Sequence, residues 1–119
     1  MKSRKELIRE YKRTPKEMGV YRIRNTVNGR SYVAASRDIQ ARFNRHKMSL
    51  KTGGEEVKPL LADWQEHGED AFVFEVLDQL TPLDKPDWDP TDDLQALEEL
   101  WLEQLKPYEP VGYNRLPKR

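Results

Sequence analysis

The chain has 119 residues, enough for one domain around one compact core, and its 35% of charged residues balance to a net charge of zero. It contains no cysteine and two histidines, which excludes a disulfide framework and a thiolate metal site and leaves oxygen donors for any catalytic metal. No stretch approaches the roughly 20 apolar residues of a membrane span, so we expect a cytoplasmic protein that binds no membrane.

The charge is unevenly distributed along the chain. Residues 1–52 hold 15 Lys and Arg against 4 Asp and Glu, whereas residues 53–119 hold 6 against 17. A basic half can neutralise phosphates, and an acidic half can hold a divalent cation. Charge runs are most often solvated faces, so this asymmetry permits a nucleic-acid partner without requiring one.

The pattern of the first 17 residues predicts a basic helical arm. Residues 18–116 are expected to form one domain that begins with a β-hairpin. Two β-prone runs flank an Asn-Gly pair at 28–29, which is a strong tight-turn signal. A two-residue loop there makes Asn25 face Tyr32, and the side chains of Tyr21 and Tyr32 then project from the same face of the hairpin.

Two helices are expected after the hairpin. Ser36 or Asp38 can cap the first helix, which ends near the Gly pair at 53–54. The second fits residues 55–66, and Gly68 ends it.

The second half of the domain predicts one strand and one further helix. The apolar run at 71–77 is the strongest strand signal and predicts a buried, central strand. Residues 81–90 read as an irregular loop, after which Thr91 caps a helix with an apolar stripe. Glu98 lies inside that stripe, where a carboxylate needs a partner.

Several of these side chains suit phosphodiester hydrolysis, which requires an activated water and positive charge near the phosphoryl oxygens. Arg42 can hold a phosphate and lies four residues before His46, on the same helical face. Glu98 can bind one hard cation such as Mg²⁺, and Tyr21 or Tyr32 can position or deprotonate the water. Each feature alone is more often structural than catalytic.

The order and spacing of several sequence segments point to one protein family more specifically than any single residue does. The informative segments are GVY at 19–21, YVA at 32–34, RFNRHK at 42–47, WQEHG at 64–68 with the strand 72–77, Glu98 before Trp101, and GYN at 112–114. Together they resemble the GIY-YIG nuclease family, and most closely its homing-endonuclease branch.

The resemblance implies an α/β (α+β) fold in which helices flank a small three-stranded antiparallel sheet, and cleavage of DNA with a single Mg²⁺ or Mn²⁺. By position, Tyr21 or Tyr32 would orient or deprotonate water, Arg42 would stabilise the phosphate, His46 would assist proton transfer, Glu98 would hold the metal, and Asn114 would support the site by hydrogen bonding. The basic residues expected to bind nucleic acid are Arg30, Arg37, Arg42, Arg45 and Lys47.

The sequence departs from the family pattern at two places. Ala34 stands where the family has Gly, and its methyl group could crowd an approaching phosphate or a neighbouring strand. Residues 53–56 read Gly-Gly-Glu-Glu where homing-type members place a further His, which removes one proton-transfer group and adds negative charge.

Two other functions are therefore considered. The chain could be a catalytically weakened nucleic-acid-binding module, or an interaction domain whose acidic C-terminal half binds a protein. Trp88 in the acidic loop could anchor a partner or an oligomer, or could cover the chain's own core.

Overall fold

The computed structural model describes residues 16–83 and 85–116, so most of the expected N-terminal arm lies outside the described residues. The elements are β1 (Gly19–Asn25), β2 (Ser31–Ser36), α2 (Ile39–Thr52), α3 (Lys58–His67), the short 3-10 helix η1 (Glu69–Ala71), β3 (Phe72–Gln79) and α4 (Thr91–Leu105). Within the described residues, no helix combines the length and apolar character needed to cross a membrane.

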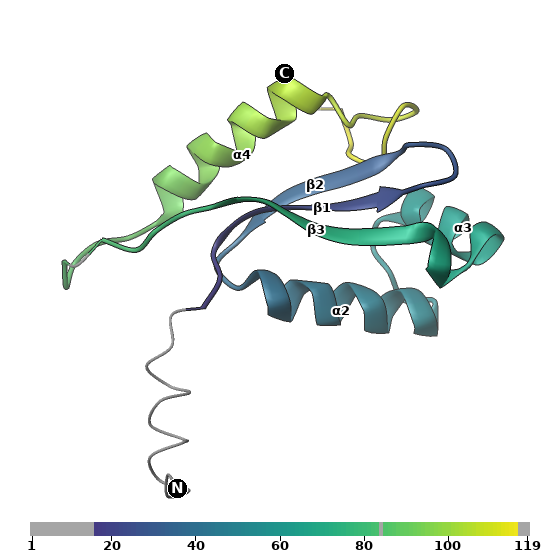
Figure 1. Ribbon diagram of the computed structural model, residues 1–119, viewed down its shortest axis with the longest axis horizontal. Coiled ribbons are helices and arrows are strands. Elements are labelled where there is room, and N and C mark those ends of the chain that lie inside the picture. The colour runs from purple at the N-terminus through teal and green to yellow at the C-terminus, as the bar shows by residue number, and fades with distance from the viewer. Residues whose placement is uncertain (1–15, 84, 117–119) are drawn as a thin grey trace, which may run out of the picture.

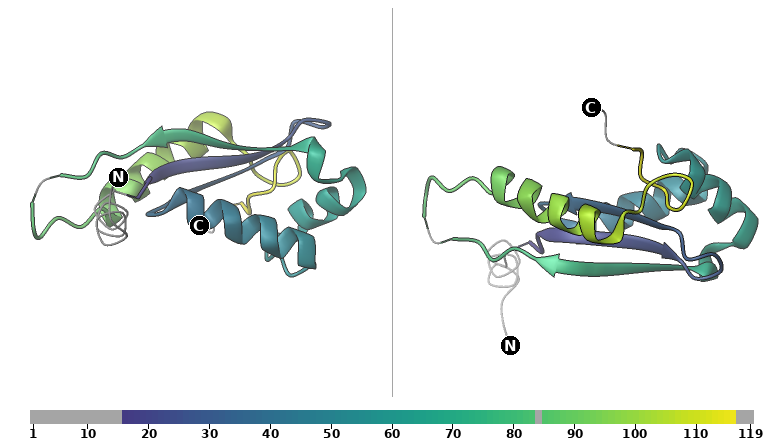
Figure 2. Two further views of the ribbon diagram at one scale, coloured as in Figure 1. Left: turned by 60° about the horizontal axis from the view of Figure 1, so that its bottom comes forward. Right: turned by 90° about the horizontal axis from the view of Figure 1, so that it is seen from above.

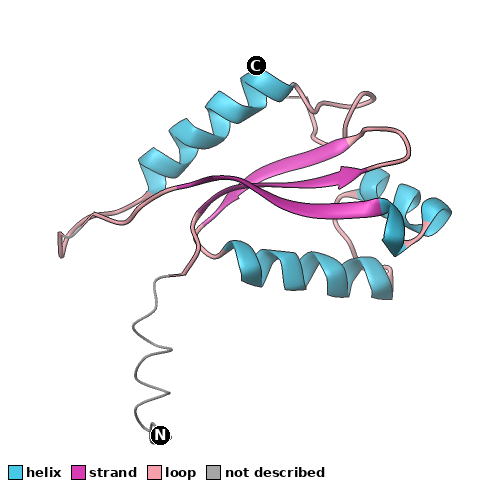
Figure 3. Cartoon of the chain, in the orientation of Figure 1, coloured by secondary structure: helices cyan, strands magenta, loops and turns pink. Residues whose placement is uncertain are grey.

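The strands form one antiparallel sheet in the order β2-β1-β3, with α2 and α3 on one face and α4 on the other (Figures 1 and 3). Figure 2 shows the same three layers from two further sides. The predicted α+β fold with a three-stranded sheet is thus confirmed.

The prediction that the strand at 71–77 is central was wrong, because β1 is the central strand and β3 is an edge. Phe72, Phe74 and Val76 pack toward α2 and α3, which explains half of the apolar run. A continuous apolar run indicates that both faces of a strand are partly covered. It does not indicate that the strand has a neighbouring strand at both of its edges.

The hairpin register differs from the predicted one by two residues. The Asn25 amide donates to the Arg30 carbonyl at 2.8 Å, which closes a four-residue loop at 26–29, and Ile23 rather than Asn25 faces Tyr32. The longer loop is favoured because the Asn25 side chain accepts a hydrogen bond from the backbone two residues on. A shift of two preserves the facing of side chains, so the shared face of Tyr21 and Tyr32 is confirmed.

The ends of α2 follow the sequence, whereas the start of α4 does not. Asp38 caps α2 by accepting from the Ala41 amide at 3.1 Å, and Gly53 ends it in the left-handed conformation at φ 83°. Thr91 is not the cap of α4 but its first residue, and its hydroxyl donates to Asp89 at 2.6 Å.

Helix α3 begins at Lys58, three residues later than predicted. Pro59 in its first turn favours this start, because proline cannot donate a helical hydrogen bond but fits the first helical positions. The delayed start leaves Glu55 outside the helix, and this carboxylate turns into the protein interior, where it is 3% exposed.

The backbone around position 19, the first residue of the GVY segment, requires a glycine. Gly19 lies beside a bulge in the β1–β3 pairing at φ 153°, and a Cβ atom there would overlap the backbone carbonyl oxygen of Asp78. Only glycine permits this close approach.

Candidate active site

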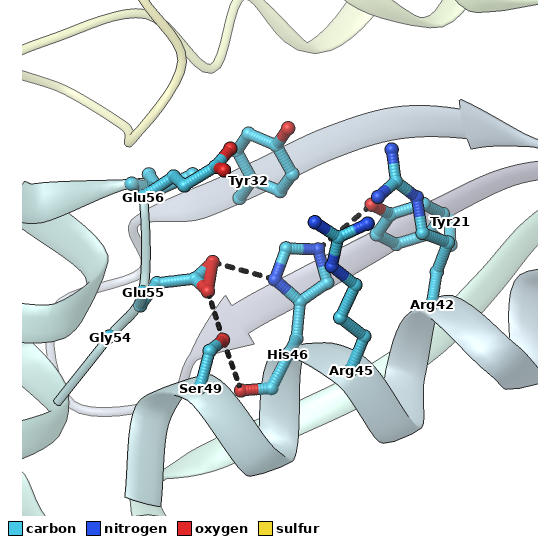
Figure 4. A pocket seen from close by; sticks show the side chains of 10 residues that line it. Tyr21, Tyr32, Arg42, Arg45, His46, Ser49, Gly54, Glu55 and Glu56 are labelled. Carbon is cyan, nitrogen blue, oxygen red and sulfur yellow. Dashed lines mark hydrogen bonds and ion pairs between the residues drawn. The ribbon is translucent and has the colours of Figure 1, made fainter. Parts of the chain in front are cut away.

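A small cavity of about 110 Å³ opens between the sheet and α2 (Figure 4). Its lining comprises Tyr21 from β1, Tyr32 from β2, Arg42, Arg45, His46 and Ser49 from α2, and residues 54–57 from the following loop. The structure therefore brings together four of the six predicted site residues and gives both tyrosines access to a cavity.

Hydrogen bonds join three of the lining residues into a chain. The Tyr21 hydroxyl lies 3.0 Å from His46 Nε2, and His46 Nδ1 lies 2.6 Å from Glu55 Oε1. The Ser49 hydroxyl donates to the other oxygen of Glu55. All four side chains point toward one another in Figure 4.

Sequence reasoning did not identify Glu55 as a site residue. The pattern at 55–66 suits an amphipathic helix, and the carboxylate was read only as added negative charge. A usable signal was present, because Gly53 ends α2 about one turn after Ser49 and two turns after His46, and it sends the chain back past that face of the helix.

Both tyrosines are neutral phenols at neutral pH. Burial raises the pKa of Tyr21 well above its ordinary value, and the neighbouring Tyr32 raises it further, while Arg42 lowers it. Burial likewise raises the pKa of Tyr32, against the opposing effect of Arg42. A neutral phenol already carries a proton, so it can take a second proton from water only if it gives its own proton to a neighbour. His46 is hydrogen-bonded to Tyr21 and is such a neighbour.

Arg42 and Glu98 both lie at the outer edge of β2, although their helices lie on opposite faces of the sheet. Both residues line a second cavity of about 370 Å³, in which Ala35, Ser36 and Gln95 supply further lining atoms. Arg42 also lines the first cavity. It is therefore common to the cavity that holds the tyrosines and His46 and to the cavity that holds Glu98.

Glu98 is oriented by the sheet edge. Its Oε2 accepts a hydrogen bond from the Ala35 amide at 2.8 Å. Ser36, Thr91 and Gln95 line the same cavity, together with Arg37 and Arg42. A carboxylate oxygen is a ligand that suits a hard divalent cation such as Mg²⁺ or Mn²⁺.

A second group capable of holding a metal lies on α3. Asp63, Glu66 and His67 each offer a ligand atom, and these atoms lie within 4.8 Å of one another. The Asp63 carboxylate, however, already accepts from the Tyr113 hydroxyl at 2.6 Å and from the Asn28 amide at 3.0 Å. This group lies at the hairpin end of the sheet, away from Arg42.

Asn114 closes the outer edge of β2 instead of lining the first cavity. Its amide group donates to the Val33 carbonyl at 2.8 Å, and its carbonyl accepts from the Val33 amide at 2.9 Å. The Tyr113 amide donates to the Ser31 carbonyl at 2.9 Å. These contacts cover the open edge of the strand that carries Tyr32.

The five basic candidates fall into two groups. Arg42 and Arg45 line the first cavity, and Arg37 lines the second while pairing with Asp89 at 2.8 Å. The other two lie elsewhere: the Lys47 ammonium is 5.0 Å from the centre of the Phe74 ring, and Arg30 pairs with Asp63 at 3.5 Å.

Ala34 does not line either of these two cavities. Its methyl group shares the face of Tyr32 and packs against the hydrophobic core between the sheet and α2. The expected crowding of a phosphate by this methyl group therefore finds no counterpart in the cavity lining.

Comparison with known proteins assigns the family. The family model described as "GIY-YIG catalytic domain" matches residues 17–114. The chain belongs to the GIY-YIG family. The chain is also similar to intron-associated endonuclease 1 of Enterobacteria phage T4, with 29% identity over 96 aligned residues, which are 81% of this chain. The chain spans only 36% of that relative's length.

Two solved GIY-YIG structures are similar to the chain. The catalytic domain of the homing endonuclease I-TevI superposes with a TM-score of 0.69 at 25% identity, covering 84% of this chain and 99% of that one. A mutant of the same catalytic domain gives a TM-score of 0.68 at 26% identity, covering 82% and 92%. The predicted resemblance to the homing-endonuclease branch is confirmed.

Proposed function

We propose that the chain is a metal-dependent endonuclease that hydrolyses phosphodiester bonds of DNA with a single divalent cation. The observation that carries this proposal is the cavity that Arg42 and Glu98 share at the edge of β2, beside the hydrogen-bonded pair Tyr21 and His46. Family membership supports the same chemistry, because the matched relatives are named endonucleases.

Each charged group has one task in this reaction. Glu98, held by the Ala35 amide, would hold the cation, which when bound supplies positive charge at the scissile phosphate. The Arg42 guanidinium binds a non-bridging phosphate oxygen from the opposite side and neutralises the charge that grows there. Arg45, on the same cavity wall, binds the neighbouring stretch of backbone.

The tyrosines and His46 handle the proton of the attacking water. Tyr21 and Tyr32 are neutral phenols, so either can hydrogen-bond a water molecule and orient it toward phosphorus. His46 is the proton acceptor within reach of Tyr21. The site thus combines orientation, a proton acceptor and positive charge, which are the requirements of hydrolysis.

Plasmid nicking tests the proposal. Supercoiled DNA is incubated with the chain in Mg²⁺, in Mn²⁺ and in EDTA, and the rate of conversion to open circles is measured. We expect metal-dependent nicking that falls on the order of 10²- to 10³-fold in Glu98→Gln. The matched control is Glu103→Gln, an exposed carboxylate on the same helix, which should cut like the wild type.

The other possible outcomes separate the competing functions. Salt-dependent DNA binding without nicking would make the chain a binding module, and absence of DNA binding at low salt would leave a protein-interaction domain. Nicking that is equal in the wild type and in Glu98→Gln would contradict the proposed role of Glu98.

A further inference from the structure

Glu55 is the most completely buried carboxylate beside the cavity, and both of its oxygens are engaged by α2. One oxygen lies 2.6 Å from His46 Nδ1, and the other accepts from the Ser49 hydroxyl. The residue is 3% exposed, and Figure 4 shows it beneath the exposed Glu56, directed at the imidazole. A buried carboxylate is costly unless it is paired and hydrogen-bonded, so these two contacts account for its placement.

The Glu55 contact determines which nitrogen of His46 carries the proton. An ionised carboxylate can only accept hydrogen bonds, so Nδ1 must be the donor in the 2.6 Å contact. In a neutral imidazole the other nitrogen, Nε2, is then an acceptor. The Tyr21 hydroxyl, 3.0 Å away, donates its proton to it.

We propose that Glu55 is a positioning residue that fixes His46 as the acceptor of the Tyr21 phenolic proton during cleavage. This inference rests on the proposed nuclease function. It also gives the acidic segment at 53–56, where homing-type members of the family were expected to place a histidine, a task within the site.

The proton transfers balance as follows. Tyr21 takes one proton from the attacking water while its own phenolic proton passes to His46 Nε2. The water becomes hydroxide, which forms the new bond to phosphorus as the bond to the leaving oxygen breaks. Tyr21 remains a phenol, and His46 becomes an imidazolium that gives its proton to solvent after the leaving oxygen has been protonated from solvent.

Glu55 stabilises the charged intermediate form of His46. Its carboxylate is in direct contact with the imidazole, so a negative charge faces the positive charge that forms on the ring when the proton arrives. The arrangement is the one in which an acid orients a histidine that serves as a base for a third side chain.

The tautomer of His46 tests the inference without DNA. The full chain is labelled with ¹⁵N, and the imidazole nitrogens are observed by NMR; only His46 and His67 contribute, and His46→Gln assigns them. We expect a proton on Nδ1 and none on Nε2 in neutral His46, and a change toward the Nε2–H form in Glu55→Ala. A wild-type His46 that carries its proton on Nε2, or an unchanged tautomer in Glu55→Ala, would overturn the inference.

Cleavage kinetics provide the second test. We expect Glu55→Ala to lower kcat on the order of 10- to 100-fold with little change in KM, and Glu55→Asp to restore part of the loss. The matched control is Glu66→Gln, an exposed carboxylate 3.9 Å from the other histidine, His67, which should leave His46 and cleavage unchanged.

Two combinations of these results distinguish failure of the nuclease proposal from failure of the inference on Glu55. If the wild type does not cut DNA but His46 shows the expected tautomer and its loss in Glu55→Ala, the nuclease proposal fails while the positioning of His46 stands. If the wild type cuts and Glu55→Ala cuts equally well, the positioning inference fails alone. Should Glu55→Ala not fold, Glu55→Leu, which keeps much of the side-chain volume but cannot accept from Nδ1, is used for both measurements, with the same expected direction.

Discussion

Carboxylates gather with tyrosines in two regions of the molecule, one at the cavity beside β2 and one at the hairpin end of the sheet. At the hairpin end, Asp63 accepts from Asn28 and Arg30 of the hairpin and from Tyr113 of the C-terminal tail. At the cavity, Glu98 accepts one backbone hydrogen bond and lies beside Arg42. Proximity of ligand atoms alone favours the hairpin end, since Asp63, Glu66 and His67 cluster there.

The difference lies in how fully each carboxylate is used by the fold. Asp63 is occupied by donors that join the hairpin, α3 and the C-terminal tail, so its role is to hold these segments together. Among the described residues, Glu98 has one hydrogen-bond partner, the Ala35 amide, and it lines a cavity together with Arg42. A catalytic carboxylate needs unused acceptor capacity next to a phosphate-binding group. At the hairpin end the carboxylate beside Arg30 is that of Asp63, which Tyr113 and Asn28 already occupy.

The largest expected effect is on catalysis at the cavity. Arg42→Gln should reduce the rate of DNA nicking on the order of 10²- to 10³-fold, because the phosphate loses its charged donor. Arg42 is exposed, so the free energy of unfolding should change by less than about 0.5 kcal/mol. Urea denaturation and nicking are measured on the same preparation, and wild-type nicking by this variant would remove Arg42 from the mechanism.

The next effect is on stability at the hairpin end. Asp63→Ala leaves the buried Tyr113 hydroxyl and the Asn28 amide without their acceptor, which should lower the free energy of unfolding by about 2–3 kcal/mol. Nicking per folded molecule should stay within about twofold of wild type, a ratio that corresponds to about 0.4 kcal/mol. Loss of nicking in a folded Asp63→Ala protein would show that this region takes part in catalysis.

The same carboxylate makes stability depend on pH. Burial by itself would raise the pKa of Asp63, but hydrogen bonds from Tyr113 and Asn28 and the charge of Arg30 outweigh it, so the pKa lies below the ordinary 3.8. A lowered folded-state pKa contributes stability that is full above the ordinary value and is lost as the pH falls below it. The unfolding free energies of wild type and Asp63→Ala should therefore converge between pH 5 and about pH 3. A constant difference over this range would contradict the assignment.

The smallest effect is expected at Ala34. Ala34→Gly removes a methyl group from the core and frees the backbone of a strand, which should cost about 0.5–1 kcal/mol of stability. The methyl group lines neither cavity, so nicking should be unchanged. A rise in nicking of tenfold or more would show that the methyl group obstructs the substrate.

Local patterns predicted much of the fold and of the site. Alternation along the hairpin placed Tyr21 and Tyr32 on one face even though the loop length was wrong, because a two-residue shift keeps the parity. Asp38 and Gly53 marked the ends of α2 since their conformational preferences are local. Helical spacing placed Glu98 within the apolar stripe of α4, although its partner, the Ala35 amide, is 63 residues away in sequence.

The features that escaped prediction depend on contacts between distant segments. Strand β3 is apolar enough to be central, but its position at the edge follows from how the chain returns to β1. Glu55 fits a helix start by composition, and only the buried contacts with His46 and Ser49 show why it lies outside. Sequence spacing alone cannot place Arg30 beside Asp63 or Lys47 over Phe74.

Binding of Mn²⁺ tests the choice between the two regions most directly. The ¹⁵N-labelled chain is titrated with Mn²⁺, whose unpaired electrons broaden the amide signals nearest to the bound ion. We predict that the Ala35 amide, which donates to Glu98, broadens first and that Glu98→Gln abolishes this effect. Broadening that begins at Asp63, Glu66 and His67 and persists in Glu98→Gln would contradict the assignment of Glu98 as the metal ligand.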